Sequence, residues 1–267
     1  MRVLSVQDLS CLGKCSLTVA LPVLSAMGCA ATPLPTTLLS THTAFPQPYR
    51  KSLTEDMEKI CDHWKSIGAE FDTVSTGYLA DALQVEAVSR VLDAFPEALH
   101  IVDPVMGDHG RLYSAITQEH AQAMAALCRR ADVILPNVTE AAILTGLPYR
   151  ETADLGYYRE LLAGLETFGA KHVILTGVSL EAGKLGCFGK DELGEFSCQN
   201  AKVERSCHGT GDLFAAVVAG AMTRGKSCRE AAALAAEFTR LVVENTPVST
   251  PFGTEFEKCL PWLISAI

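Results

Sequence analysis

A glycine-rich stretch, Cys-His-Gly-Thr-Gly-Asp-Leu at residues 207–213, combines residue types that could bind an anion and move a proton. Gly209, Thr210 and Gly211 precede Asp212 and an apolar segment that is typical of a buried helix. Backbone N–H groups at a helix start favour an anion such as a phosphate. An aspartate there could take a proton from a substrate hydroxyl group. A glycine turn with a capping aspartate is the common alternative, and this stretch alone does not exclude it.

Two acidic motifs elsewhere in the chain could hold a divalent cation. Asp103 and Asp108 flank Pro-Val-Met-Gly, and Asn137 and Glu140 stand at a predicted helix start. The second spacing places both side chains on one side of the first helical turn, where their oxygens or bound waters could hold Mg²⁺. An asparagine N-cap with a glutamate that reaches back, a capping box, gives the same pattern. The two interpretations are compatible, and both remain open at this point.

Short apolar strands and helices that alternate along the chain must position these residues. Strands are predicted at Arg2–Val6, Cys29–Pro35, Phe71–Ser75, His100–Val102, Val133–Leu135 and His172–Leu175, with a hairpin at Leu185–Phe188 and Glu195–Cys198. Helices are predicted at Ser16–Met27, Leu53–Ile67, Ala82–Ala94, Glu119–Arg130, Thr139–Thr145, Leu155–Phe168, Gly211–Arg224, Cys228–Asn245 and around Glu255–Ile264. Repeated strand–helix units predict an α/β fold with a doubly wound, mostly parallel sheet covered by helices on both faces.

Two further expectations concern the organisation of the chain. Pro33 and Pro35 are expected to end the second strand near a sheet margin, followed by a polar loop at Thr36–Pro48. No internal repeat, low-complexity tract or linker divides residues 1–267, which predicts a single domain.

Polar residues follow nearly every predicted strand. In an open α/β sheet the ligand lies at the carboxyl ends of the strands. The residues at these ends are Asp8, Thr43, Tyr78, Asp103, Asn137 and Thr176, together with the glycine stretch before Asp212. Each one alone is more often a solvated strand end, but their recurrence favours a shared site.

Composition narrows the range of partners. The chain carries 22 basic and 31 acidic residues, a net charge of −9 without a basic cluster, which disfavours nucleic acid and anionic membranes. Ten scattered cysteines complete neither a disulfide framework nor a zinc set, so a reduced cytoplasmic protein is expected. No signal peptide or apolar run of about 18 residues is apparent.

Taken together, the motifs resemble those of the ribokinase superfamily, and within it the vitamin B6 kinases. Asp-Pro-Val-Met-Gly-Asp (103–108), Asn-x-x-Glu (137–140) and Gly-Thr-Gly-Asp (209–212) occur in the family's order, and Thr-Gly-Tyr (76–78) also matches. The similarity runs from Arg2 to about Asn245, and the segment 8–28 resembles the bacterial pyridoxamine kinase-like branch. The resemblance implies a ribokinase-like three-layer α/β/α fold. It also implies ATP-dependent phosphorylation of the 5′-hydroxymethyl group of pyridoxal, pyridoxamine or pyridoxine.

The resemblance also implies roles for individual residues. Asp212 would be the general base, and the amides of Gly209, Thr210 and Gly211 would form an anion hole. Asn137 and Glu140 would order Mg²⁺ through its waters. The nucleotide and its phosphates would meet Asp103, Asp108, Tyr113, Asn137, Thr176 and Gly177. The vitamer would meet Asp8, Ser10, Thr43 and Tyr78. K⁺ as a second cation and a homodimer are further expectations from the family.

Two departures from the family pattern leave alternatives open. The best-known pyridoxal kinases carry serine where this chain has Asp8, and a carboxylate there could favour pyridoxamine by charge pairing. His208 before the glycines is also familiar from hydroxymethylpyrimidine kinases, which usually carry cysteine where this chain has Asp212. A hydroxymethylpyrimidine kinase is therefore the alternative, and a non-catalytic vitamer-binding protein is the second alternative. A dinucleotide oxidoreductase is disfavoured because no Gly-x-Gly-x-x-Gly follows the first strand.

Overall fold

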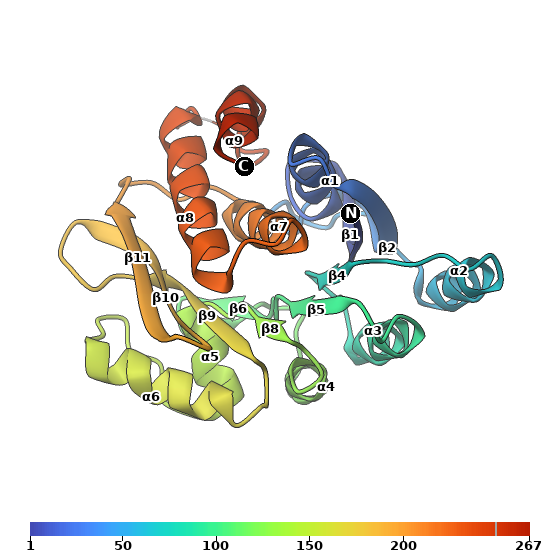
Figure 1. Ribbon diagram of the computed structural model, residues 1–267, viewed down its shortest axis with the longest axis horizontal. Coiled ribbons are helices and arrows are strands. Elements are labelled where there is room, and N and C mark those ends of the chain that lie inside the picture. Colours follow the sequence, from blue (N-terminus) through green and yellow to red (C-terminus); the bar gives the residue numbers. More distant parts are fainter. Residues whose placement is uncertain (249) are drawn as a thin grey trace.

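The computed structural model describes residues 1–248 and 250–267 (Figure 1). Within these residues the main sheet has nine strands in the order β11-β10-β9-β8-β5-β4-β1-β2-β3. Its central strands pair in parallel: β1 (Arg2–Leu12), β2 (Ala30–Thr41), β4 (Thr73–Thr76), β5 (Leu99–Val102), β8 (Val133–Ile134) and β9 (His172–Val178). The predicted α/β class with a mostly parallel sheet is confirmed.

Antiparallel strands complete both edges of the sheet. One edge is β3 (Arg50–Ser52), and the other is the hairpin of β10 (Lys184–Asp191) and β11 (Gly194–Ala201). A separate hairpin, β6 (Gly107–Asp108) with β7 (Arg111–Leu112), was not predicted from the sequence.

Helices cover both faces, as Figure 1 shows. One face carries α2 (Thr54–Ser66), α3 (Ala82–Ala94), α4 (Gln118–Cys128), α5 (Val138–Thr145) and α6 (Leu155–Glu166). The other face carries α1 (Leu17–Ala26), α7 (Thr210–Thr223), α8 (Cys228–Asn245), the short helix η1 (Glu257–Cys259) and α9 (Leu260–Ala266). Neighbouring strand residues such as Ile101 and Val102 enter opposite cores, which explains the continuous apolar strands. No helix in the described ranges is long and apolar enough to cross a membrane.

The second strand is longer than predicted. β2 passes through Pro33 and Pro35 and continues to Thr41, so the expected loop begins only after that residue. The edge strand β3 pairs with residues 37–39 alone, and both prolines therefore lie where β2 has only β1 as a neighbour. A missing N–H is tolerated at such a margin. The position of the prolines was predicted correctly, but the end of the strand was wrong.

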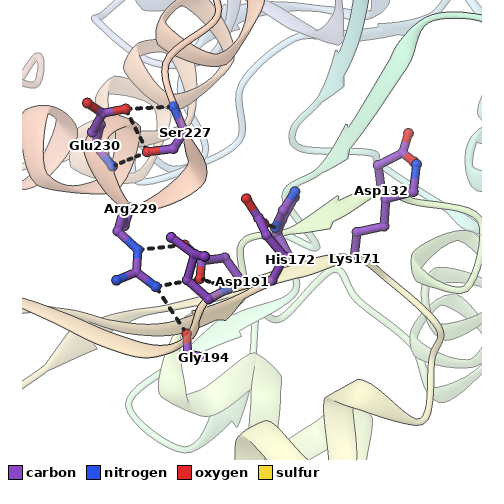
Figure 2. A network of polar contacts seen from close by, with 10 residues as sticks. Asp132, Lys171, His172, Asp191, Gly194, Ser227, Arg229 and Glu230 are labelled. Atoms are coloured by element: carbon purple, nitrogen blue, oxygen red, sulfur yellow. Dashed lines mark hydrogen bonds and ion pairs between the residues drawn. The ribbon is translucent and has the colours of Figure 1, made fainter.

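The β10–β11 hairpin is fixed to the start of α8 by an ion pair (Figure 2). Arg229 Nε donates to Asp191 Oδ2 at 2.8 Å, and Arg229 Nη2 donates to Asp191 Oδ1 at 2.5 Å. The Asp191 carboxylate also accepts from the Leu193 amide, and its side chain is only 1% exposed. A capping box between Ser227 and Glu230 begins α8 directly beside this contact.

Candidate active site

The predicted glycine loop lies at the N-terminus of α7. Gly209 is the N-cap of this helix with φ 87°, in the left-handed region. A Cβ atom at this position would lie 2.2 Å from the carbonyl oxygen of Lys14, so no larger residue fits. A Cβ atom at Gly211 would meet nothing within 4 Å. The loop therefore contacts the β1–α1 turn tightly at Gly209, whereas the space beside Gly211 is open.

Segments far apart in the sequence hold this loop in place. The Lys14 amide donates to the Phe252 carbonyl at 2.7 Å, and the Thr254 amide donates to the His208 carbonyl at 3.1 Å. The His208 ring lies against the ring of His42 at an angle of 36°, with 5.0 Å between their centroids. These contacts indicate a structural role for His208.

Asp212 begins α7 in a partly buried position beside the β1–α1 turn. Burial raises the pKa of Asp212 to about 6, the nearby charge of Asp8 adds to this rise, and the backbone amide of Ser16 opposes it. A carboxylate with a pKa near neutrality is suited to accept a proton at physiological pH. The structure thus places Asp212 close to Asp8, as the strand-end argument predicted.

Asp8 is almost fully buried and has two hydroxyl donors. Ser10 Oγ donates to Asp8 Oδ2 at 2.9 Å, and Ser16 Oγ donates to Asp8 Oδ1. Burial raises the pKa of Asp8, while these hydroxyl groups and the more distant charge of Arg50 lower it. Ser10 therefore orients the Asp8 carboxylate, and Asp8 is the residue of this pair that is available to a ligand.

Asp103 connects the glycine loop with the second acidic motif. Its carboxyl group is buried, and that burial raises its pKa well above the ordinary value. The charges of Glu140 and Asp212 raise it further, so the three carboxyl groups share one electrostatic environment. No hydrogen bond to the Asp103 carboxylate occurs within the described part of the chain, which leaves its oxygens available to a ligand.

Asn137 and Glu140 form the capping box that the sequence allowed. Asn137 Oδ1 accepts from the Glu140 amide, and Glu140 Oε2 accepts from the Asn137 amide, both at 2.9 Å. Glu140 Oε1 accepts from the Met106 amide at 3.0 Å, and Asn137 Nδ2 donates to the Gly107 carbonyl. Burial raises the pKa of Glu140 to about 8, although these amides lower it. The pair therefore ties the 103–108 loop to the start of α5.

The nucleotide-side candidates lie around this acidic centre. Tyr113 is 43% exposed, and partial burial with the charges of Glu140 and Asp108 raises its pKa. The Asp108 side chain is 54% exposed and accepts from the amide of His109. The Thr176 amide donates to the Pro136 carbonyl and forms a parallel bridge with Asn137. Gly177 follows with φ 70°.

The two ring-binding candidates differ in their surroundings. Tyr78 is buried next to Gly77, and burial raises the pKa of its hydroxyl group, with Asp8 adding and Arg50 opposing. The Tyr78 hydroxyl has no hydrogen-bond partner among the described residues. Thr43 is exposed on the loop after β2, directly following the buried His42. The structure therefore places Tyr78 near Asp8, whereas no contact connects Thr43 with the site.

The carboxyl groups of this centre suit a cation, although the described side chains do not form a complete set of metal ligands. No three His, Cys, Asp or Glu side chains within the described residues are arranged to hold a metal ion. Both Glu140 oxygens already accept backbone amides, so that carboxylate is suited to contact a cation through water. Burial raises the pKa values of Asp103, Glu140 and Asp212, and a cation bound among these carboxyl groups would favour their ionised forms.

Sequence reasoning missed two residues in this centre. Ser16 has φ 52°, which is unusual for a residue other than glycine, and it contacts both Asp8 and Asp212. Cys15 is beside them, and burial followed by the charges of Asp212 and Asp8 raises its pKa. The helix predicted from residue 16 gave no sign of a strained turn, so no signal in the sequence marked either residue.

Residues 20–254 match the model of a family described as phosphomethylpyrimidine kinase. The chain belongs to this kinase family. It is 30% identical over 243 residues to the pyridoxine/pyridoxal/pyridoxamine kinase of Bordetella avium, covering 86% of this chain and 80% of that one. It is 33% identical over 177 residues to the hydroxymethylpyrimidine/phosphomethylpyrimidine kinase of Bacillus subtilis, covering 66% and 64%.

Solved structures agree with this family assignment. A crystal structure of pyridoxal kinase from Lactobacillus plantarum is 35% identical with a TM-score of 0.90, covering 99% of this chain and 96% of that one. A putative phosphomethylpyrimidine kinase from Bacteroides thetaiotaomicron, crystallised with pyridoxal, is 34% identical with a TM-score of 0.92, covering 98% and 95%. The kinase is thus a phosphotransferase that uses an alcohol group as acceptor, and the resemblance to the ribokinase-like B6 kinases is confirmed for fold and family.

Proposed function

We propose that this kinase transfers the γ-phosphoryl group of ATP to the 5′-hydroxymethyl group of a vitamin B6 compound. The observation that carries the proposal is the position of Asp212. It lies in the first turn of α7 beside the glycine loop, close to Asp8 and to Asp103, and Asp103 is in turn close to Glu140. The pyridoxal kinases among its relatives and the Bacteroides neighbour with pyridoxal support the choice of substrate.

In this proposal Asp212 is the general base. Its carboxylate accepts the proton of the substrate hydroxyl group as the oxygen attacks phosphorus. The amides of Gly209, Thr210 and Gly211, at the positive end of the α7 dipole, bind the phosphoryl oxygens. Because Gly209 is held tightly against Lys14, these amides are oriented before the substrate arrives, which lowers the cost of reorganisation during the reaction.

Mg²⁺ supplies charge neutralisation for the transferred phosphoryl group when it is bound. Asp103 has free carboxylate oxygens for this purpose, and Asn137 with Glu140 would order the cation's waters. Asp108, Tyr113, Thr176 and Gly177 would surround the nucleotide. No residue here indicates K⁺ specifically, so that cation is proposed from the family alone.

We assign Asp8, held by Ser10 and Ser16, to the choice of vitamer. A buried carboxylate with a raised pKa gains most from a cationic partner, and pyridoxamine carries an aminomethyl group that is protonated at neutral pH. Tyr78, whose hydroxyl group has no hydrogen-bond partner among the described residues, would contact the pyridine ring, and Thr43 would hydrogen-bond to it from the exposed loop after β2. Pyridoxamine is therefore the vitamer that this site favours.

A hydroxymethylpyrimidine kinase is the second candidate, because the family description and the Bacillus relative carry that activity in their names. ADP release measured side by side with pyridoxal, pyridoxamine, pyridoxine and hydroxymethylpyrimidine tests both candidates. We expect the B6 compounds to give the higher kcat/KM. A higher value with hydroxymethylpyrimidine would reverse the assignment. Thermal stabilisation by a vitamer without ADP release would instead indicate a non-catalytic binding protein.

The organisation of the protein completes the proposal. We infer that residues 1–267 act as a single domain, since one sheet passes between both cores. A homodimer in the cytoplasm is proposed from the family, with no nucleic-acid partner. Sedimentation of the purified protein tests the dimer.

A further inference from the structure

Two cysteines face each other in the β10–β11 hairpin at the edge of the sheet, where Cys187 also pairs with Thr176 of β9. Cys187 of β10 and Cys198 of β11 are register partners in an antiparallel pair (Figure 1). Directly opposite residues have Cα atoms about 4.5–5.5 Å apart and point to the same face of the sheet. Disulfides span about 4.4–6.8 Å between Cα atoms. Both thiols are free in this structure.

The common face of this pair lies under α8. Cys187 is fully buried in the core beneath that helix, and Cys198 packs against the same core but stays partly exposed. The ion pair of Arg229 with Asp191 holds α8 on the hairpin (Figure 2), which fixes the register of the two strands. The strands therefore hold Cys187 and Cys198 directly opposite each other in the folded protein.

The two thiols are also chemically unequal. Proximity to the Cys187 thiol and the charge of Arg229 lower the pKa of Cys198 against the effect of burial. Proximity to Cys198 and deep burial raise the pKa of Cys187, and Cys198 is also the more exposed of the two. The thiolate is the attacking species in disulfide exchange, so Cys198 is the partner suited to react first.

We propose that Cys187 and Cys198 form an intrachain disulfide when the folded protein meets a small-molecule disulfide such as glutathione disulfide. The Cys198 thiolate attacks one sulfur of the oxidant, forming a mixed disulfide and releasing one glutathione thiolate. Cys187 then loses its proton and attacks the Cys198 sulfur, releasing the second glutathione. The two cysteines lose two protons and two electrons, and glutathione disulfide gains them as two molecules of glutathione.

A third thiol close to the pair provides a control for its specificity. Cys228, the first residue of α8, is buried in the same core and lies near Cys198. Burial raises the pKa of Cys228 to about 12, with the charges of Asp191 and Glu192 adding to the rise. Cys228 is also not a register partner of either strand cysteine. It should therefore remain reduced while the pair is oxidised.

Differential alkylation and peptide mapping of the full-length protein test this proposal. The native protein is treated with glutathione disulfide, its free thiols are blocked with iodoacetamide, and the cross-linked peptides are identified by mass spectrometry. We expect a 187–198 cross-link that dithiothreitol removes, while Cys228 is alkylated. Cys198→Ser, at the less buried position, should abolish the cross-link, and Cys228→Ser should retain it.

Two results would overturn the pairing. One is a cross-link of Cys198 to Cys228, and the other is only a stable mixed disulfide with glutathione. Near-ultraviolet circular dichroism of each variant shows that the cysteines were tested in the folded protein. If Cys198→Ser does not fold, the rate of iodoacetamide labelling in the wild type tests which of the two cysteines reacts first. Cys198 should then be labelled well before Cys187, and equal rates would contradict the assigned order.

Discussion

Replacing Asp212 with asparagine removes the proposed proton acceptor while preserving the shape of the side chain. Loss of a general base costs roughly 10²–10⁴-fold in rate. At about 1.36 kcal/mol for each factor of ten, this corresponds to about 2.7–5.4 kcal/mol of transition-state stabilisation. The KM for ATP should change little, because the glycine-loop amides and the residues around Asp103 remain in place.

The pH dependence makes this prediction more specific. Burial raises the pKa of Asp212 to about 6, so its carboxylate is about 90% ionised at pH 7 and about 10% ionised at pH 5. The kcat/KM of the wild type should therefore fall about tenfold between these pH values if this group alone limits the rate. Steady-state ADP release between pH 5 and 8 measures both the fall and the effect of Asp212→Asn.

The asparagine variant should lose this acidic limb together with most of its activity. A variant with near-normal kcat, or one with low activity and an unchanged acidic limb, would refute the base assignment. Tight binding of ATP by the variant, measured by calorimetry, would show that the site is still assembled. Asp212→Ala tests whether the loss depends on the carboxylate or on the shape of the side chain.

Three further predictions concern the neighbours of this centre and the edge of the sheet. Asp8→Asn should move the acidic limb of kcat/KM to lower pH, because the Asp8 charge raises the pKa of Asp212. Asp8→Ser should lower the ratio of kcat/KM for pyridoxamine to kcat/KM for pyridoxal. An unchanged ratio would reject the role of Asp8 in vitamer choice. Glu140→Gln should raise the Mg²⁺ concentration needed for half-maximal activity, and an unshifted titration would count against that role. Burial raises the pKa of Glu140 from the ordinary 4.5 to about 8, so its contribution to stability is fully present below about pH 4.5 and is lost as the pH rises to about 8. The thermal midpoint without cation should therefore fall between about pH 5 and about pH 8, and less so in Glu140→Gln. Arg229→Met should lower the urea midpoint of unfolding clearly more than Arg159→Met. The first variant leaves the buried Asp191 carboxylate without its partner, whereas the Glu195 partner of Arg159 is 39% exposed. Equal shifts would show that the Arg229–Asp191 ion pair contributes little to stability.

The sequence was most informative about helices that carry their own start and stop signals. The bounds of α3 and α8 agree with the predicted ranges, and each begins with a side-chain cap, Asp81 and Ser227 respectively. Strand ends were less predictable, because a strand continues as long as its neighbour offers hydrogen bonds. The extension of β2 beyond Pro35 depends on β1 and β3, which no local pattern reveals.

The same distinction applies to the candidate site. Parallel strands bring their carboxyl ends to one edge, so the proximity of Asp103, Glu140 and Asp212 could be predicted from strand order alone. The link through Ser16 could not, because it depends on a left-handed backbone conformation in a turn. Thr43 shows the limit of the strand-end rule, since the structure places it on an exposed loop after β2.

The tight contact between Gly209 and Lys14 also has a consequence for the order in which the molecule is built. Lys14 comes early in the chain and Gly209 comes late, and Gly253, later still, lies against the same carbonyl group. A ribosome supplies these three segments from the N-terminus onward, at about 5–20 residues per second. A nascent chain that has already paired β1 with β2 therefore lacks an anion-binding loop. The capacity to hold phosphate is acquired near the end of synthesis, after most of the sheet has been made.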